Sequence, residues 1–225
     1  MQAVRERIAA AATRAGRSVS EITLLAVSKA QPVEALRAAA ALGVRDFGES
    51  YLKEALEKLD ALQRQPLTWH FVGRLQANKT RAIAERFQWV HGLDRLHIAE
   101  RLSAQRPFHA APLEVCIQVN LGGEVNKGGV AAAELAALAA AVAALPRLRL
   151  RGLTVMAAAG TGAQVSRDTF ARLRSLQRRL IAAGVPLDSL SMGMSGDFRE
   201  AILEGATLVR IGTALFGPRF HTTLR

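Results

Sequence analysis

The sequence predicts a single (β/α)8 barrel of the TIM type with one extra helix at its N-terminus. Three observations lead to this fold class: eight short apolar segments alternate with helical segments, several of those segments are apolar on both faces, and no linker or change of composition divides the 225 residues. Strands buried on both faces are typical of parallel sheets, and alternating strands and helices favour right-handed crossovers. Eight such units close a barrel. We therefore expect residues 1–225 to form one domain.

The first half of the chain supplies four of these strands. A helix over 4–15 is stopped by Gly16, a residue type that often ends helices. Pro32 opens the helix after the first strand, Gly43 closes it, and Asn78 can cap the helix that runs to about residue 87. The four predicted strands are 22–29, 45–50, 68–73 and 88–93, and the remaining helices are 52–62 and 96–103.

The second half completes the ring with strands over 113–119, 148–156, 190–194 and 207–215. A glycine-rich loop leads to an alanine-rich helix within 130–145, and a short helix covers 197–203. Ser166 can cap the longest helix, whose apolar stripe comprises Phe170, Leu173, Leu176, Leu180 and Ile181. The alternative, an open doubly wound sheet, would usually carry a phosphate-binding glycine motif after its first strand, and residues 28–32 contain no glycine.

Composition excludes several classes of protein. Half of the residues are hydrophobic and 22% are charged, which is not the profile of a disordered chain. No apolar segment reaches the roughly 18–20 residues of a membrane span, and the N-terminus does not read as a signal peptide, so we expect a cytoplasmic protein. Cys116 is the single cysteine and is expected to be buried, and the five histidines lack metal-ligand spacing. We therefore expect no disulfide and no metal site.

The net charge of +11 could indicate a nucleic-acid partner. The chain has 25 Arg and 5 Lys, and the arginines are scattered, without an RNA-binding motif beside them. We therefore expect no specific nucleic-acid partner.

Chemistry in a barrel sits where the strands end at their carboxyl side. Lys29 ends the first strand. Apolar surroundings lower the pKa of a lysine, and a neutral amine can form a Schiff base with an aldehyde. The alternative is a lysine that only extends to the barrel rim. Ser28 points to the opposite face of the strand, which argues against a Ser–Lys dyad.

The last two strands end in residues suited to an anion. Ser195 precedes a short helix, and Gly212 and Thr213 offer close backbone approach and a hydroxyl group, a combination that predicts a phosphate site. Arg210 would lie buried near the barrel mouth and therefore needs an acceptor. That acceptor is either a carboxylate, such as Glu49 or Asp197, or a ligand.

These segments make the chain recognisable. It resembles the pyridoxal-phosphate homeostasis proteins, single-domain relatives of the alanine racemase barrel, and the matching segments are 25–29, 47–51, 70–79, 118–120, 191–197 and 209–217. The resemblance implies that Lys29 carries pyridoxal 5'-phosphate as a Schiff base. It implies that Ser195, Gly212 and Thr213 bind the phosphate and that Arg210 faces the pyridine nitrogen.

Three positions depart from the family pattern. Ser50 stands where the family usually has asparagine, Asn126 where it has serine, and the segment from Met156 to Gly160 lacks a usual proline. We still place Ser50 and Met156 in the cofactor site.

The resemblance implies a binding protein that stores and exchanges pyridoxal phosphate without turnover of its own, so we assign no catalytic residue. Alanine racemases add a second domain with a catalytic tyrosine, whereas this chain ends soon after the eighth strand and its only tyrosine is Tyr51. We therefore expect a monomer, with apo-enzymes that depend on the cofactor as possible recipients. The alternatives are a racemase or lyase of limited activity that uses Lys29 as its base, and a nucleic-acid module.

Overall fold

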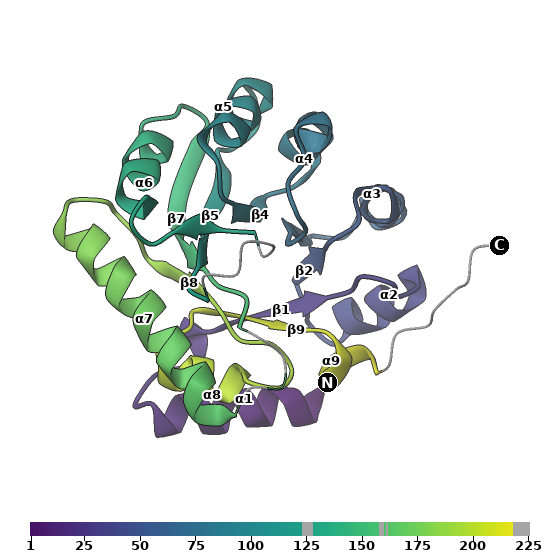
Figure 1. Ribbon diagram of the computed structural model, residues 1–225. Coiled ribbons are helices and arrows are strands. Elements are labelled where there is room, and N and C mark those ends of the chain that lie inside the picture. Colours follow the sequence, from purple (N-terminus) through teal and green to yellow (C-terminus); the bar gives the residue numbers. More distant parts are fainter. Residues whose placement is uncertain (123–127, 158–159, 161, 218–225) are drawn as a thin grey trace.

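The barrel is closed in the computed structural model, which describes residues 1–122, 128–157, 160 and 162–217 (Figure 1). Within these residues, eight parallel strands form the ring in the order β1–β2–β3–β4–β5–β7–β8–β9, and pairing of β9 with β1 closes it. The strands are β1 (Thr23–Val27), β2 (Asp46–Glu49), β3 (Thr68–Phe71), β4 (Trp89–Leu93), β5 (Leu113–Asn120), β7 (Leu148–Thr154), β8 (Ser189–Ser191) and β9 (Leu208–Ile211). The predicted (β/α)8 fold is confirmed.

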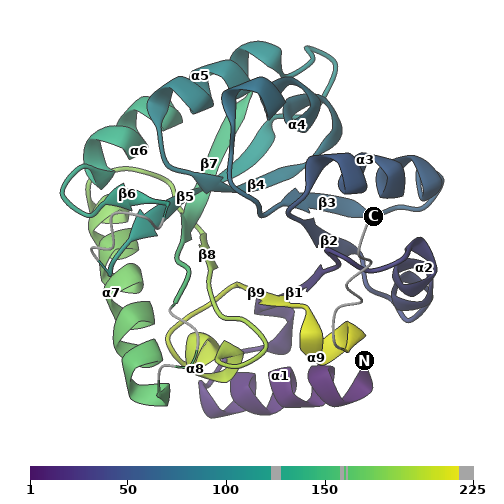
Figure 2. The same ribbon diagram turned by 45° about the vertical axis from the view of Figure 1, so that its right-hand side comes forward.

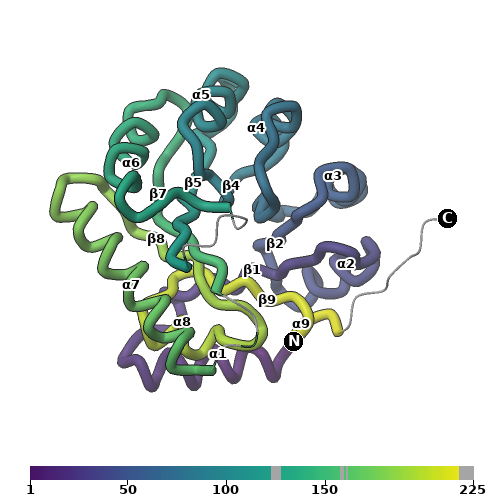
Figure 3. The backbone as a smooth tube through the Cα atoms, in the orientation of Figure 1, coloured from purple at the N-terminus to yellow at the C-terminus, as the bar shows by residue number. Residues whose placement is uncertain are grey.

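Helices surround the strands, as the turned view makes clear (Figure 2). The extra N-terminal helix, α1, packs beside α8 (Figure 3). The guanidinium of Arg7 lies 4.8 Å from the centre of the Phe198 ring. The helices are α1 (Gln2–Arg14), α2 (Val33–Ala41), α3 (Leu52–Ala61), α4 (Thr80–Arg86), α5 (Leu96–Gln105), α6 (Leu135–Ala143), α7 (Ala163–Ala182), α8 (Phe198–Leu203) and α9 (Thr213–Phe216). None of those in the described ranges has both the length and the apolar character of a membrane span.

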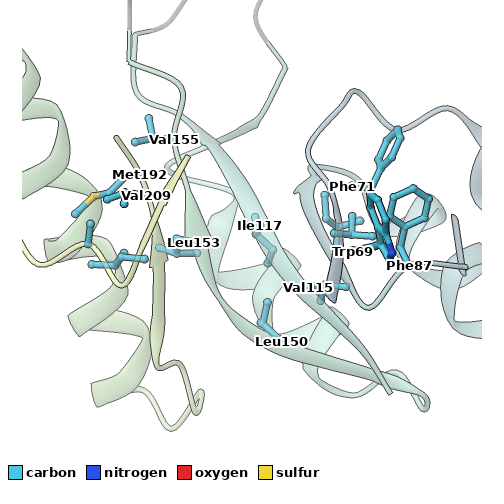
Figure 4. Close-up of a cluster of buried hydrophobic side chains, with 14 of the residues drawn as sticks. Trp69, Phe71, Phe87, Val115, Ile117, Leu150, Leu153, Val155, Met192 and Val209 are labelled. Atoms are coloured by element: carbon cyan, nitrogen blue, oxygen red, sulfur yellow. The ribbon is translucent and has the colours of Figure 1, made fainter. Parts of the chain in front are cut away.

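Side chains alternate along each strand between the helix-facing core and the barrel interior. The core cluster contains residues such as Val115 and Ile117 of β5 and Val209 of β9 (Figure 4). Cys116 and Arg210, which lie between such residues, are also buried but belong to the opposite face of their strands. The interior of this barrel therefore holds polar side chains as well as apolar ones.

Several predicted boundaries were wrong. Asn78 lies inside a short 3₁₀ turn (Ala77–Lys79) and does not cap α4. Helix α7 begins at Ala163 after an extended Gly162, so Ser166 is a buried residue inside the helix rather than its cap. Ile181 is 45% exposed because it lies about 100° around the helix from the buried Leu180.

The last strand is shorter than predicted, and the difference affects the candidate site. The strand ends at Ile211 because the backbone of Gly212 leaves the extended region, with φ −111° and ψ −81°. Thr213 is therefore the first residue of α9 and not a strand residue. In the alanine-rich region, the short strand β6 (Val130–Ala131) pairs with the end of β5 before α6 begins.

Candidate functional site

A cavity of about 210 Å³ opens where the strands end at their carboxyl side. All seven residues that the sequence analysis assigned to a cofactor line it: Lys29, Ser50, Met156, Ser195, Arg210, Gly212 and Thr213. Their role in binding stays a prediction, but the fold brings them to one place. The predicted departures at Asn126 and at residues 158–159 lie outside the described residues.

The cavity also borders residues that the sequence analysis did not propose: Val27, Gln31, Val72, Met194, Gly196 and Gly217. Of the two methionines that follow β8, Met192 is fully buried in the core, whereas Met194 is partly exposed and lines the cavity. The signal that could have found these residues is their position at or within three residues of a predicted strand end, or beside Ser195.

Lys29 lies in a tight turn directly after β1. The backbone N–H of Gln31 donates to the carbonyl of Ser28 at 3.1 Å, and Ala30 has a left-handed φ of +58°. A non-glycine residue in this conformation costs on the order of 1 kcal/mol. The N–H of Ala30 donates to Oε1 of Glu54 at 2.7 Å, and this bond from helix α3 holds the turn in place.

Behind this turn lies a cluster of polar and charged residues, which we call the rim network: Ser28, Glu49 and Lys58, which are buried, and Glu54, which is partly exposed. The hydroxyl of Ser28 donates to Oε1 of Glu49 at 2.6 Å, and Lys58 Nζ lies 2.8 Å from the same oxygen. Lys58 also donates to Oε1 of Glu54 at 2.5 Å and to the carbonyl of Ser28 at 2.7 Å. Burial raises the pKa of Glu49, while Lys58 and Ser28 act in the opposite direction. The network ties the end of β1 to β2 and α3.

The predicted phosphate site lies at the ends of β8 and β9. Ser195 Oγ accepts a hydrogen bond from the N–H of Ala214 at 3.3 Å, which joins the β8 loop to α9. The N–H of Met194 donates to Asp197 at 2.6 Å, and burial raises the pKa of that carboxyl group. A Cβ atom at Gly212 would lie 3.1 Å from the carbonyl oxygen of Val27, so only glycine fits this place without displacing β1.

Arg210 is 5% exposed and reaches its partners across the top of the barrel. Its Nη1 donates to Thr154 Oγ1 at 2.8 Å, to the Ser191 carbonyl at 2.5 Å and to Ser191 Oγ at 2.9 Å. Its Nη2 contacts the carbonyl of Val155 at 2.8 Å and the sulfur of Met156 at 3.3 Å. Burial lowers the pKa of Arg210 to about 10, so the group stays charged at neutral pH.

The sequence left open whether Arg210 pairs with a carboxylate. Among the described residues, Arg210 forms no direct ion pair with a carboxylate. Glu49 is paired with Lys58, and Asp197 accepts a hydrogen bond from the backbone N–H of Met194. Asp197 raises the pKa of Arg210 through a longer-range electrostatic interaction, without a hydrogen bond. The guanidinium Nε–H has no hydrogen-bond acceptor in the part of the chain that the structure describes, and it remains available to a ligand in the cavity.

Comparison with known proteins identifies the family to which a chain with this site belongs. The model of the family "Alanine racemase, N-terminal domain" matches residues 1–219. The pyridoxal phosphate homeostasis protein of Pseudomonas aeruginosa is 56% identical over 96% of this chain and 93% of its own length.

A solved structure of PipY from Synechococcus elongatus PCC7942, without PLP, is 40% identical with a TM-score of 0.84, over 95% of this chain and 99% of that one. The same protein with PLP bound is 38% identical with a TM-score of 0.83, over 95% and 100% of the two chains. The chain therefore belongs to the alanine racemase N-terminal domain family and, within it, to the pyridoxal phosphate homeostasis proteins.

Proposed function

We propose that this protein binds pyridoxal 5'-phosphate in the cavity and that Lys29 is the point of covalent attachment. The observation that carries the proposal is that Lys29, Ser195, Gly212 and Thr213 line one cavity with Arg210 in its wall. The bound PLP in PipY supports it.

The residues of the cavity fit the group. Ser195 already accepts one hydrogen bond, so its own O–H remains for a phosphate oxygen, and Gly212 and Thr213 line the cavity with it. Arg210 would hold the pyridine nitrogen, with its Nε–H as the donor that no described residue accepts. An arginine keeps its proton and disfavours protonation of that nitrogen, so the bound cofactor supplies only a weakened electron sink.

Storage and exchange of the cofactor without turnover is the function that this arrangement supports best. Among the described residues that line the cavity, the ionisable side chains are Lys29 and Arg210. Tyr51, the only tyrosine, is 59% exposed and is not part of the lining. Proton transfer on both faces of a substrate needs a second acid or base opposite Lys29. We further propose one domain, a monomer in the cytoplasm, and dependent apo-enzymes as recipients.

A racemase or lyase of limited activity, with Lys29 as its base, is the second candidate because the chain shares its family with the alanine racemase domain. Hydrogen exchange at Cα of amino acids in D₂O separates the two functions. Storage predicts no exchange above the level of a Lys29→Ala variant. Exchange at ordinary enzymatic rates by the wild-type protein would overturn it.

The visible spectrum of the purified protein tests the binding proposal. After incubation with pyridoxal phosphate and borohydride, mass spectrometry should find the cofactor on the peptide that contains Lys29. Lys29→Ala should abolish the attachment, and Lys53→Ala, at an exposed lysine, should not. A wild-type protein that stays colourless with pyridoxal phosphate before borohydride is added, or a label on another lysine, contradicts the proposal.

A further inference from the structure

A continuous chain of hydrogen-bonding side chains leads away from Arg210 into the barrel. Arg210 Nη1 lies 2.9 Å from Ser191 Oγ, which lies 2.8 Å from Nδ1 of His91. Nε2 of His91 lies 2.9 Å from Nδ1 of His70, and Nε2 of His70 lies 3.0 Å from Oδ1 of Asp46. We call Ser191, His91 and His70 the interior relay.

The relay crosses the barrel rather than following one strand. Arg210 and Ser191 come from β9 and β8, whereas His91, His70 and Asp46 come from β4, β3 and β2. The two histidines are 3% and 1% exposed and Ser191 is fully buried, while the side chain of Asp46 is 28% exposed. A buried guanidinium at the cavity is thus connected to a carboxylate that reaches solvent.

The chemistry of the two ends fixes the direction of every bond between them. Arginine can only donate, and an ionised carboxylate can only accept. His70 therefore donates from Nε2 to Asp46, and as a neutral ring it accepts at Nδ1 from Nε2–H of His91. His91 in turn accepts at Nδ1, so the hydroxyl of Ser191 donates to it and accepts from Arg210. Each link donates toward Asp46.

This direction requires both histidines to be neutral. Burial lowers the pKa of His70, against the opposing effect of Asp46, and it lowers the pKa of His91 well below the usual value, with His70 and Arg210 acting in the same direction. From β5, Cys116 faces the same interior, and burial raises the pKa of its thiol to about 12, so it carries no charge. Arg151 of β7 lies 5.1 Å from the Trp89 ring, which stacks on His70.

We propose that Ser191, His91 and His70 are positioning residues that hold the Arg210 guanidinium in one orientation at the cavity. The relay engages Nη1 and leaves Nε–H for the cavity. This inference rests on the proposed function, because it gives Arg210 its role at the pyridine ring. Loss of the relay should leave the guanidinium held by Thr154 and by backbone carbonyl groups, and the resulting change in its orientation should alter both the affinity for the cofactor and its absorption maximum.

The first test uses the protein without cofactor. Nitrogen-15 NMR of the histidine rings at pH 7 should show His70 and His91 as neutral rings with hydrogen on Nε2. Ser191→Ala should shift the Nδ1 resonance of His91, and Ser189→Ala should not, because Ser189 bonds to Asp188 outside the relay. Hydrogen on Nδ1 of His91 in the wild-type protein would overturn the proposed direction.

The second test adds pyridoxal phosphate. Ser191→Ala should weaken binding about three- to tenfold, the size that corresponds to the loss of one ordinary hydrogen bond, and should shift the absorption maximum. Ser191→Thr, which keeps the hydroxyl group, should restore both, and Ser189→Ala should match the wild type. Wild-type affinity and spectrum in Ser191→Ala would overturn the positioning role. If the wild type binds no cofactor, the proposed function fails, while the NMR result still decides the relay.

Discussion

The rim network behind Lys29 and the interior relay behind Arg210 solve the same problem in different ways. Each supports a basic residue of the cavity with polar side chains that are largely buried. The rim network places formal charges in direct contact, with Lys58 Nζ within 2.8 Å of both Glu49 and Glu54. The relay places neutral groups between the charges of Arg210 and Asp46.

The difference between the two networks follows from which elements of the fold lie next to each of them. Helix α3 lies beside the ends of β1 and β2, and its Lys58 is one helical turn from Glu54, so a counter-charge is available there. The relay, by contrast, is built from strand residues: Ser191 of β8, His91 of β4 and His70 of β3. A charge buried there without a partner is costly, whereas serine and neutral histidine each donate and accept and so can relay a hydrogen bond without charge.

The largest predicted effect comes from breaking the rim network at its cation. Lys58→Met leaves Glu49 buried beside Glu54 without a counter-charge, and we expect a loss of about 3–5 kcal/mol in unfolding free energy. Urea denaturation measures it. Lys53→Met, at an exposed position of the same helix, should change stability by less than about 0.5 kcal/mol. Equal losses in the two variants contradict a role for the ion pair.

Sequence reasoning located both basic residues of the cavity because their signals are local. Lys29 and Arg210 each stand in or just after an apolar strand of a predicted barrel, where alternation and strand ends define the site. Their supports could not be predicted in the same way. Lys58 looks like any helix-surface lysine until α3 is packed against β1 and β2. The meeting of Ser191 with His91, 100 residues apart, depends on how the barrel closes.

One signal for the relay was present in the sequence. His70 lies between Trp69 and Phe71, both buried, and Arg210 lies between Val209 and Ile211. A single polar residue between helix-facing apolar neighbours must point to the barrel interior. Two such residues on different strands indicate a polar interior. The distance between them cannot be predicted from the sequence, because it depends on how the strands are aligned in the closed barrel.

Acid should lower the stability of the protein through the two histidines of the relay. Both histidines have a folded-state pKa below the usual 6.5, so below about pH 6.5 the unfolded chain binds more protons than the folded one. Stability therefore falls as pH decreases, by up to about 1.4 kcal/mol per pH unit for each histidine. Urea midpoints between pH 8 and 5 measure the slope.

Two variants show whether this slope comes from the relay. His91→Gln should flatten it, whereas His109→Gln, at an exposed residue, should leave it unchanged. A wild-type stability that is constant from pH 7 to 5.5 is the result that contradicts the neutral state of the histidines.

The smallest predicted effect concerns the hydroxyl of Ser28. It tests whether the rim network depends more on the Lys58–Glu49 ion pair than on this hydroxyl. Ser28→Ala removes the hydroxyl that donates to Glu49 but leaves Lys58 on the same oxygen, so we expect a loss of only about 1 kcal/mol. A double-mutant cycle with Glu49→Gln should give a coupling energy of about that size.

A loss in Ser28→Ala as large as in Lys58→Met would mean that the hydroxyl, and not the lysine, keeps Glu49 in place. The two networks would then both depend on a serine hydroxyl at their centre, and the contrast between a charged rim and a neutral interior would no longer explain how the cavity is supported.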